Sequence, residues 1–518
     1  MDPMLPQPLA RGQAPRWPHH LAAIDMGSNS FRLEIGEVVP GGYRRIAYLK
    51  ETVRLGAGLD ASGLLTEEAA RRGLACLAGF AQRLSGYDAL QVRAVATQTL
   101  REARNRDAFL ARAQATLGYP IEVISGREEA RLIFSGVARL QPSAVPRLVI
   151  DIGGRSTEMI IGSARRALRA ESFQVGSVSL SLRYFADGHL TKAAFQQAQI
   201  AAGAELEEAL IPFARPHWDE ALGSSGTVSA VSQLLQASGR TDGTITPEGL
   251  RWCISRCVRA GHIDRLDLPG LRDDRRQVIA GGLSLLYTLA THFDIDALQP
   301  ASGALRQGVI FDLAERRVAA QDPARAHDMR DASVLELQRR FMVDAQQATS
   351  VAQLADRLYA GVQPHPRADP TGEPRRELRW AAALHEAGMM VSHHDHHRHS
   401  AYVLAHVDAA GFSQSQQRRL ADLVLAQRGS LRKSEPALAN AGFAWQALCL
   451  RLAIIKCHAR RPIDLDALQL QRDGDRARLV HAPGWAERNP RTLYLLQEEV
   501  LAWERSGPLR LRIEPRAS

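Results

Sequence analysis

Two short stretches of the chain share one pattern of apolar and polar positions. In Leu21–Gly36 (LAAIDMGSNSFRLEIG) and Leu148–Gly162 (LVIDIGGRSTEMIIG), an apolar run leads into a turn of small polar residues and then into a second apolar run. A shift of 126 residues superimposes the two stretches and places Asp25 on Asp151. Apolar runs of this length around such turns predict β-hairpins. The chain therefore contains a duplicated hairpin with an acid at the start of each turn.

Helical spacing of apolar residues follows each hairpin. After the first hairpin it predicts helices over 66–84, 106–117 and 125–140, and after the second over 192–210 and 274–292. A strand is expected near 90–96, and the polar segment 97–105 (TQTLREARN) is expected to be a turn. Strands followed by helices, twice, predict two α/β lobes.

Strand patterns become rare after about residue 315. Long Ala, Leu, Arg and Gln patterns over 330–460 predict an all-helical domain. The last residues predict a hairpin around Gly474, a helix from Asn489 and a final strand. The expected organisation is a flexible tail at 1–20, two lobes at 21–132 and 133–318, a helical domain at 319–460 and a small α+β domain at 461–518.

Composition narrows the class of protein. The chain has 518 residues, 45% of them hydrophobic, which is enough for several buried cores. No apolar run approaches the roughly 18 residues that cross a bilayer, and the Pro-rich N-terminus lacks the apolar core of a signal peptide. Five scattered cysteines indicate reduced thiols and a cytoplasmic protein. Cys253 and Cys257 are expected to be small apolar residues on a buried helix face, in preference to a redox or metal pair.

The net charge of +9 indicates polyanionic partners. Polyphosphate, nucleotides, nucleic acid and an anionic membrane surface all satisfy this condition. Backbone N–H groups of a Gly turn can approach phosphate oxygens because no Cβ intervenes. A carboxylate in the same turn would repel phosphate unless a divalent cation lay between them. Two such turns facing across a cleft would hold a chain of phosphates.

These segments resemble the two phosphate motifs of the exopolyphosphatase/guanosine pentaphosphate phosphatase (Ppx/GppA) family. Further similar motifs occur in the same order, namely VRLGAGLD (53–60), ATQTLREARN (96–105), ISGREEARLIFSGV (124–137), GSSGTVSAV (223–231) and SGALRQGVIFDL (302–313). The resemblance implies duplicated lobes of the actin-like ATPase fold shared with sugar kinases and Hsp70. It continues more weakly through RWAAALHEAG and HRHSAYVL. This extent resembles the long four-domain exopolyphosphatases, which have an HD-like helical domain. The resemblance to these long members also implies a homodimer.

The resemblance also implies roles for individual residues. Glu129 corresponds to the catalytic glutamate, the general base for the attacking water. Asp151 and Glu158 correspond to carboxylates near Mg²⁺ or another divalent cation, and K⁺ is a further candidate ion. Arg101 corresponds to a substrate-binding arginine. The phosphate-binding turns are Gly27, Ser28, Asn29, Ser30, Gly153, Gly154, Arg155, Ser156, Thr157, Gly226 and Thr227.

The adjacent acids Glu128 and Glu129 are expected to have different roles. Ser125 and Glu128 have the spacing of a capping box, in which the Glu128 carboxylate reaches back to the helix N-terminus and leaves Glu129 free to point elsewhere.

Arg155 stands where the family usually has a third glycine. If that position required φ > 0, an Arg would cost on the order of 1 kcal/mol. The side chain could instead face polyphosphate, or lower activity.

A histidine-rich segment lies in the helical domain. The segment LHEAGMMVSHHDHHRHS (384–400) contains six histidines. A working HD-type metal site needs an adjacent His-Asp pair, but this chain has His385-Glu386 at that place. Gln347 stands where a further metal-binding His would be expected. We expect a degenerate structural domain, with metal binding and a pH-dependent cationic patch as the alternatives.

The function expected from these observations is metal-dependent hydrolysis of terminal phosphate from inorganic polyphosphate. Guanosine pentaphosphate (pppGpp) hydrolysis is the alternative within the family, because both activities share every motif. A weakly active polyphosphate or alarmone sensor, motivated by Arg155, and an ATP-dependent sugar kinase are the alternatives of other classes. No specific nucleic-acid partner is expected, and peripheral contact with an anionic membrane stays open.

Overall fold

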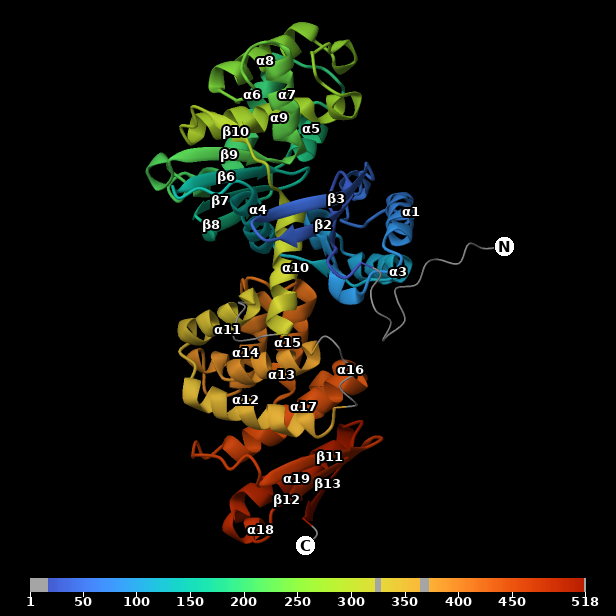
Figure 1. Ribbon diagram of the computed structural model, residues 1–518, viewed down its shortest axis with the longest axis vertical. Helices are drawn as coiled ribbons and strands as arrows, with labels where there is room; N and C mark the ends of the chain where they lie inside the picture. Colours follow the sequence, from blue (N-terminus) through green and yellow to red (C-terminus); the bar gives the residue numbers. More distant parts are fainter. Residues whose placement is uncertain (1–16, 322–327, 364–371, 517–518) are drawn as a thin grey trace, which may run out of the picture. The chain divides into compact units, whose positions relative to one another are not determined.

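The computed structural model describes residues 17–321, 328–363 and 372–516 (Figure 1). The chain divides into two compact units, Met1–Arg317 and Val318–Ser518. Of the tail expected at 1–20, residues 1–16 lie outside the described part. None of the helices in these described ranges is long and apolar enough to cross a membrane.

Lobe I of the first unit is built on a five-stranded sheet of order β3-β2-β1-β4-β5. Strands β1, β2 and β3 form an antiparallel meander, and β4 and β5 run parallel to β1. β1 is buried along its whole length, which is why it is a continuous apolar run in the sequence. The elements are β1 (Leu21–Met26), β2 (Phe31–Val39), β3 (Gly42–Glu51), α1 (Glu67–Arg83), β4 (Val92–Ala96), α2 (Gln98–Glu102), α3 (Arg106–Leu117) and β5 (Ile121–Val123).

Lobe II repeats this arrangement. Its sheet has the order β10-β9-β6-β7-β8, which is the order of lobe I seen from the other edge, and β6, β7 and β8 form the meander. The strands are β6 (Arg147–Ile152), β7 (Thr157–Ser163), β8 (Arg166–Phe173), β9 (Glu220–Ser224) and β10 (Leu298–Pro300). The helices are α5 (Ser177–Tyr184), α6 (Lys192–Glu205), α7 (Ser225–Ala237), α8 (Pro247–Ala260) and α9 (Asp273–His292).

The two hairpins have equivalent registers. Leu21 pairs with Gly36 in the first hairpin, and Arg147 pairs with Gly162 in the second. The duplicated lobes and their mixed sheets confirm the predicted actin-like fold class. The segment 97–105 was expected to be a turn, and this prediction is wrong, because Gln98–Glu102 forms the helical turn α2 around a fully buried Leu100. The Gln98 side chain stabilises it, because it donates to Glu102 and accepts from Arg101.

Helices α4 (Gly126–Leu140) and α10 (Leu305–Gln321) share a hydrophobic cluster with both sheets. Two glycines bring these helices into backbone contact. A Cβ built on Gly308 would lie 1.8 Å from the carbonyl oxygen of Leu132, and one on Gly136 would lie 2.3 Å from that of Ala304. The boundary predicted between 132 and 133 falls inside α4. α4 is therefore the rigid element against which both lobes are positioned.

The second unit combines helices with a small sheet of order β11-β12-β13. Its helices are α11 (Met329–Arg340), α12 (Ala345–Ala360), α13 (Glu373–Leu384), α14 (His396–His406), α15 (Gln414–Ala426), α16 (Glu435–Leu438), α17 (Ala441–Cys457), α18 (Trp485–Arg488) and α19 (Pro490–Ser506). Its strands are β11 (Leu468–Asp473), β12 (Arg476–His481) and β13 (Arg510–Pro515).

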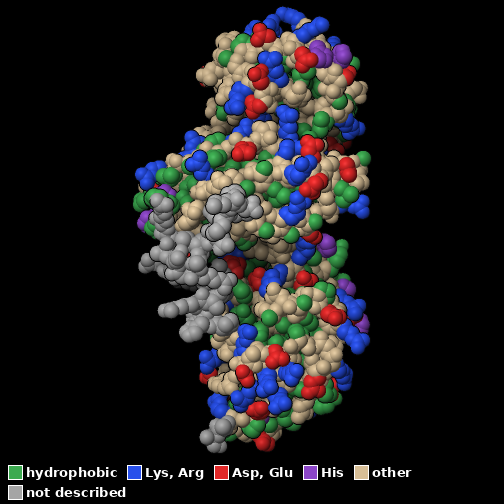
Figure 2. All heavy atoms as spheres, turned by 90° about the vertical axis from the view of Figure 1, so that its right-hand side faces the viewer, with side chains coloured by type: hydrophobic (Ala, Val, Ile, Leu, Met, Phe, Trp, Pro, Cys, Tyr) green, Lys and Arg blue, Asp and Glu red, His purple; other side chains and the backbone are tan. Residues whose placement is uncertain are grey.

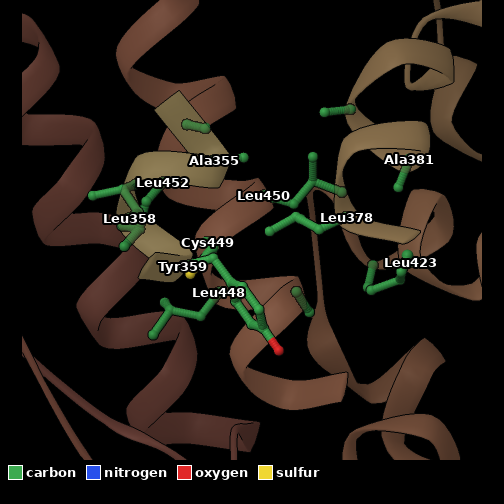
Figure 3. Close-up of a cluster of buried hydrophobic side chains, with 14 of the residues drawn as sticks. Ala355, Leu358, Tyr359, Leu378, Ala381, Leu423, Leu448, Cys449, Leu450 and Leu452 are labelled. Carbon is green, nitrogen blue, oxygen red and sulfur yellow. The ribbon is translucent and has the colours of Figure 1, made fainter. Parts of the chain in front are cut away.

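Helix α17 forms the centre of this unit because most of its sides are apolar. Figure 3 shows Leu448, Cys449, Leu450 and Leu452 of α17 packed among side chains of α12 and α13. The same hydrophobic core includes residues of all three strands, such as Leu470, Leu479 and Leu511. The helical part and the small sheet therefore share one core. All five cysteines of the chain are free and buried, Cys253 and Cys257 included.

The α4–α10 contact generates a stability prediction. Gly308→Ala is expected to lower the free energy of unfolding by about 1–3 kcal/mol, because the new methyl group overlaps the Leu132 carbonyl. Gly79→Ala in α1 is the matched control, since a Cβ there meets nothing within 4 Å. The control is expected to raise stability by about 0.5–1 kcal/mol. Urea denaturation measures both, and equal stabilities would contradict the contact.

Candidate active site

The two hairpin turns line one cavity of about 420 Å³ in the first unit. The β1–β2 turn contributes Gly27, Ser28, Asn29 and Ser30, and the β6–β7 turn contributes Gly153, Gly154 and Ser156. The turns also touch, because a Cβ on Gly154 would lie 3.4 Å from the Cβ of Ser28. The structure thus brings together the two turns that the sequence repeat singled out, 126 residues apart.

The N-terminus of α7 forms a further wall of the cavity, through Ser225, Gly226 and Thr227. Ser225 has a φ of 97°, a left-handed conformation that a residue with a side chain rarely adopts. Strain of this kind gathers at functional sites, and the N–H groups of a helix N-terminus suit an anion. The sequence reasoning selected Gly226 and Thr227 but missed Ser225, whose strain depends on the tertiary structure.

The buried carboxylates lie beside these turns. Glu129, in the first turn of α4, lines the cavity, and its Oε2 accepts a 2.7 Å hydrogen bond from Nη1 of Arg101. Burial raises the pKa of Glu129 to about 7; Arg101 opposes this shift, and Asp25 and Asp151 add to it. Burial likewise raises the pKa of Asp151. The site thus holds a carboxylate of near-neutral pKa, the property required of a general base at neutral pH.

Glu128 and Glu129 point to different surroundings, as predicted, but the capping box is wrong in part. The Ser125 hydroxyl does accept a hydrogen bond from the backbone N–H of Glu128. The Glu128 carboxylate, however, does not turn back to the helix N-terminus. It binds Arg131 at 2.7 and 2.8 Å, because a buried carboxylate gains more from a guanidinium than from one backbone N–H.

The two hairpins differ at one paired position. Asp25 faces Arg32 across β1 and β2, and Asp151 faces Glu158 at the equivalent place across β6 and β7. Nη1 of Arg32 lies 3.0 Å from Oδ2 of Asp25, so the first pair is neutralised. The second pair keeps two acids, and burial followed by the charges of Glu129 and Asp151 raises the pKa of Glu158 well above its usual range.

Six basic side chains also line the cavity, and the sequence reasoning assigned a role to none of them. They are Arg32, Arg45, Lys50, Arg272, Arg275 and Arg306. Burial and then Arg275 lower the pKa of Lys50, and burial and then Arg32 lower the pKa of Arg275. Cations that crowd one another in this way favour a polyanion between them. Arg306 lies in the segment SGALRQG, which could have pointed to it.

Four predicted residues do not line the cavity. Thr157 is buried and donates its hydroxyl proton to the carbonyl of Val175, so its side chain does not face the cavity. The Glu158 carboxylate lies behind Asp151 and accepts a hydrogen bond from Ser172. Arg101 lies behind Glu129, which it binds.

Arg155 is the fourth. Its side chain binds Glu102 at 2.8 Å and does not line the cavity, so a contact of Arg155 with phosphate stays a prediction. Its φ does not fall in the left-handed region, where seven other non-glycine residues of the described chain do. The third glycine of the family pattern is therefore dispensable here, and the substitution costs no backbone strain.

The carboxylates of the site fit a divalent cation. Asp151 lines the cavity, and its negative charge adds to the effect of burial in raising the pKa values of Glu129 and Glu158. A cation beside Asp151 would relieve this repulsion. Within the described ranges no group of three or more His, Cys, Asp or Glu residues is arranged to hold a metal ion. Mg²⁺ needs only one or two carboxylates, since water and phosphate supply its other ligands.

The histidine-rich segment of the second unit does not form a metal site among the described residues. Arg460 donates to Glu386 at 2.6 Å, so a guanidinium already balances the carboxylate next to His385. Gln347 donates to the carbonyl of Cys457. Burial lowers the pKa values of His385, His396 and His397 to about 4, which leaves these three neutral near pH 7.

The net positive charge is not gathered on one visible surface. On the face shown in Figure 2, Lys and Arg side chains are interspersed with Asp and Glu side chains. Six basic side chains line the cavity of the first unit, together with Asp25, Glu129 and Asp151.

Comparison with known proteins agrees with this geometry. Residues 35–317 match the model of the Ppx/GppA phosphatase family, and residues 329–500 match that of Ppx/GppA phosphatase, domain III. An exopolyphosphatase from Cytophaga hutchinsonii is 24% identical, with a TM-score of 0.52, over 57% of this chain and 97% of its own. An exopolyphosphatase-like protein is 26% identical, with a TM-score of 0.52, over 58% of this chain and 99% of its own. These structures share the duplicated fold of the first unit.

The crowded cations generate a binding prediction. Arg275→Met is expected to weaken the binding of tripolyphosphate about tenfold or more, since a hydrogen bond to a charged group contributes about 1.5–3 kcal/mol. Titration calorimetry at fixed ionic strength measures the affinity. Arg259→Met, on the exposed side of α8 and away from the cavity, is the control and is expected to leave the affinity unchanged. Equal losses in the two variants would mean that only net charge matters.

Proposed function

Because the chain belongs to the Ppx/GppA phosphatase family, we propose that it is an exopolyphosphatase, which hydrolyses the terminal phosphoanhydride bond of inorganic polyphosphate. The observation that carries this proposal is the cavity itself. It combines two phosphate-sized turns and six basic side chains with one carboxylate, Glu129, whose pKa is raised to about 7. A linear chain of phosphates satisfies the cations along its length and presents its end to the carboxylate.

Glu129 is the proposed general base. Its carboxylate accepts a proton from a water molecule as that water attacks the terminal phosphorus. Arg101 holds the carboxylate through its Nη1 hydrogen bond, and Arg101 is itself held by the carbonyl of Ile124 at 3.0 Å. The ionised form of Glu129 is therefore both oriented and stabilised, although the buried surroundings favour its protonated form.

The turns stabilise the phosphoryl group during transfer. Charge spreads over the equatorial oxygens of this group, so preorganised donors around it lower the barrier. The N–H groups of the turns 27–30 and 153–156 and of the α7 N-terminus are the proposed donors. A divalent cation such as Mg²⁺, held at Asp151 with Glu158 behind it, would neutralise phosphate oxygens. K⁺ as an additional ion and the homodimer stay predictions.

The sensor alternative loses the feature that motivated it. Arg155 is unstrained and lies outside the cavity lining, so it gives no physical reason for weak activity. The solved structure at 26% identity is of an exopolyphosphatase-like protein, which agrees with hydrolysis of a polymer. The alternative substrate for the same cavity is pppGpp, and one phosphate-release assay compares it with polyphosphate.

Phosphate release from long-chain polyphosphate and from pppGpp, each with Mg²⁺, tests the function. Glu129→Gln is expected to lower kcat about 10²- to 10⁴-fold, the usual contribution of a general base. Glu128→Gln is the matched control in the same helical turn. It breaks the bond to Arg131 and is expected to lower stability while leaving most of the activity. Full activity of the Glu129 variant would exclude this mechanism.

The pH dependence is a separate prediction. Glu129 acts only when ionised, and its pKa in the free site is about 7, so kcat/KM is expected to rise with pH through that region and level off above it. The measurement is the initial rate between about pH 5 and 9 in buffers of constant ionic strength. A rate that falls as pH rises through 7 would contradict the role of Glu129 as the general base.

Transfer of phosphate from ATP to a sugar, in place of water, would support the kinase alternative.

A further inference from the structure

Arg155 joins the two lobes of the first unit. It lies in the β6–β7 turn of lobe II, and Glu102 ends helix α2 of lobe I. Nε and Nη2 of Arg155 donate to Oε2 of Glu102 at 3.1 and 2.8 Å. The two side chains are 26% and 29% exposed. The ion pair therefore bridges the lobes directly beside the candidate active site.

The Arg155 side chain is held by packing as well as by its charge. Its Nη1 lies 3.4 Å from the carbonyl oxygen of Gly56, and a Cβ on Gly56 would lie 2.9 Å from its Cδ. The stem of Arg155 thus rests on a glycine of lobe I that has no side chain to displace it. A guanidinium that is held in one place orients the carboxylate it binds.

A chain of hydrogen bonds leads from this ion pair to Glu129. Nε2 of Gln98 donates to Oε1 of Glu102 at 2.5 Å. This leaves Oε1 of Gln98 to accept from Nε and Nη2 of Arg101, at 3.0 and 2.6 Å. An amide has its donors on one side and its acceptor on the other, so the Glu102 carboxylate determines which side faces Arg101. Nη1 of Arg101 then reaches Glu129.

We propose that Arg155 is a positioning residue, which through Glu102 and Gln98 holds Arg101 against the carboxylate of Glu129. The ion pair joins residues of the two lobes, so the orientation of the base depends on a contact that neither lobe makes alone. The inference rests on the proposed function for its role in catalysis, and the hydrogen-bond chain itself does not. It gives the arginine of this turn a function other than binding substrate.

The consequence for Glu129 has a definite sign. Arg101 lowers the pKa of Glu129 against the effect of burial. If Arg101 is held less firmly, the protonated form of Glu129 is more populated at a given pH. Activity then requires a higher pH. Arg155→Met and Glu102→Met are therefore expected to move the acid limb of the kcat/KM profile upward. They are also expected to lower kcat about three- to fivefold at neutral pH, the effect of one partly exposed ion pair.

The double variant of Arg155→Met and Glu102→Met is expected to be no worse than either single one, because both act on one interaction. Arg155→Lys keeps a cation and is expected to recover part of the rate. Asp274→Asn is the matched control. It removes another pair that joins the lobes, Lys50–Asp274, whose side chains are 21% and 28% exposed, and is expected to leave the acid limb in place.

A second measurement does not need turnover. In protein labelled with ¹³C at the Glu carboxyl carbons, the Glu129 signal is identified by its loss in Glu129→Gln, and its titration midpoint is followed. The midpoint is expected to rise in Arg155→Met and in Glu102→Met and to stay constant in Asp274→Asn.

Unchanged midpoints in Arg155→Met and Glu102→Met would overturn the inference even if the enzyme is active. A raised KM with an unchanged acid limb would likewise overturn it and make Arg155 a substrate contact. If the wild-type protein releases no phosphate and the midpoints of the two variants still shift, the hydrogen-bond chain is supported and only the proposed function is refuted.

Discussion

Like charges buried next to one another are the constraint on which the site depends. On one side of the cavity, burial and then the charge of Arg275 lower the pKa of Lys50. On another, burial raises the pKa of Glu129, and the charge of Asp151 raises it further. Each arrangement is unfavourable by itself, so the rest of the fold must hold it. The backbone contact of α4 with α10 supplies a rigid base for Glu129. A ligand that brings anions to the basic groups, together with a cation for the acids, relieves both repulsions.

The duplication explains how such a site arose from one local structure. Both hairpins provide a turn of small residues and an acid at its start. They differ where Arg32 in the first copy replaces the acid that Glu158 supplies in the second. The first turn therefore carries a neutralised carboxylate and adds a cation to the cavity. The second keeps an acidic pair at the place where a divalent ion is proposed. One difference at a paired position thus separates a hairpin with an acid–base pair from one with two acids.

The extent to which the sequence predicted the site follows from how local each feature is. The turns and the placement of Glu129 in a first helical turn depend on residues close in sequence, and the structure brings these together. Lys50, Arg275 and Arg306 come from three separate elements, so no local pattern joins them. The side chains of Thr157 and Arg155 lie outside the cavity lining because each binds a partner distant in sequence or in the other lobe, the Val175 carbonyl for Thr157 and Glu102 for Arg155. The α2 turn was missed because the burial of Leu100 outweighs its polar composition.

Two buried groups, one in each unit, respond to pH in opposite ways. The pKa of Glu129 is about 7 in the folded chain against an ordinary value of 4.5, so folding takes up a proton between these values, and ionisation as pH rises through this window lowers stability. The pKa of His385 is about 4 in the folded chain against an ordinary value of 6.5, so its contribution is lost as pH falls through that window. Burial is the cause in both cases, and it disfavours the charged form of each group. In the second unit Arg460 already balances the carboxylate beside the neutral histidine, and the charges are satisfied without a ligand. In the first unit the pKa of Glu129 stays raised and those of Lys50 and Arg275 stay lowered, although Arg101 pairs with Glu129 and Asp274 with Lys50. This difference is the physical reason to place the chemistry there.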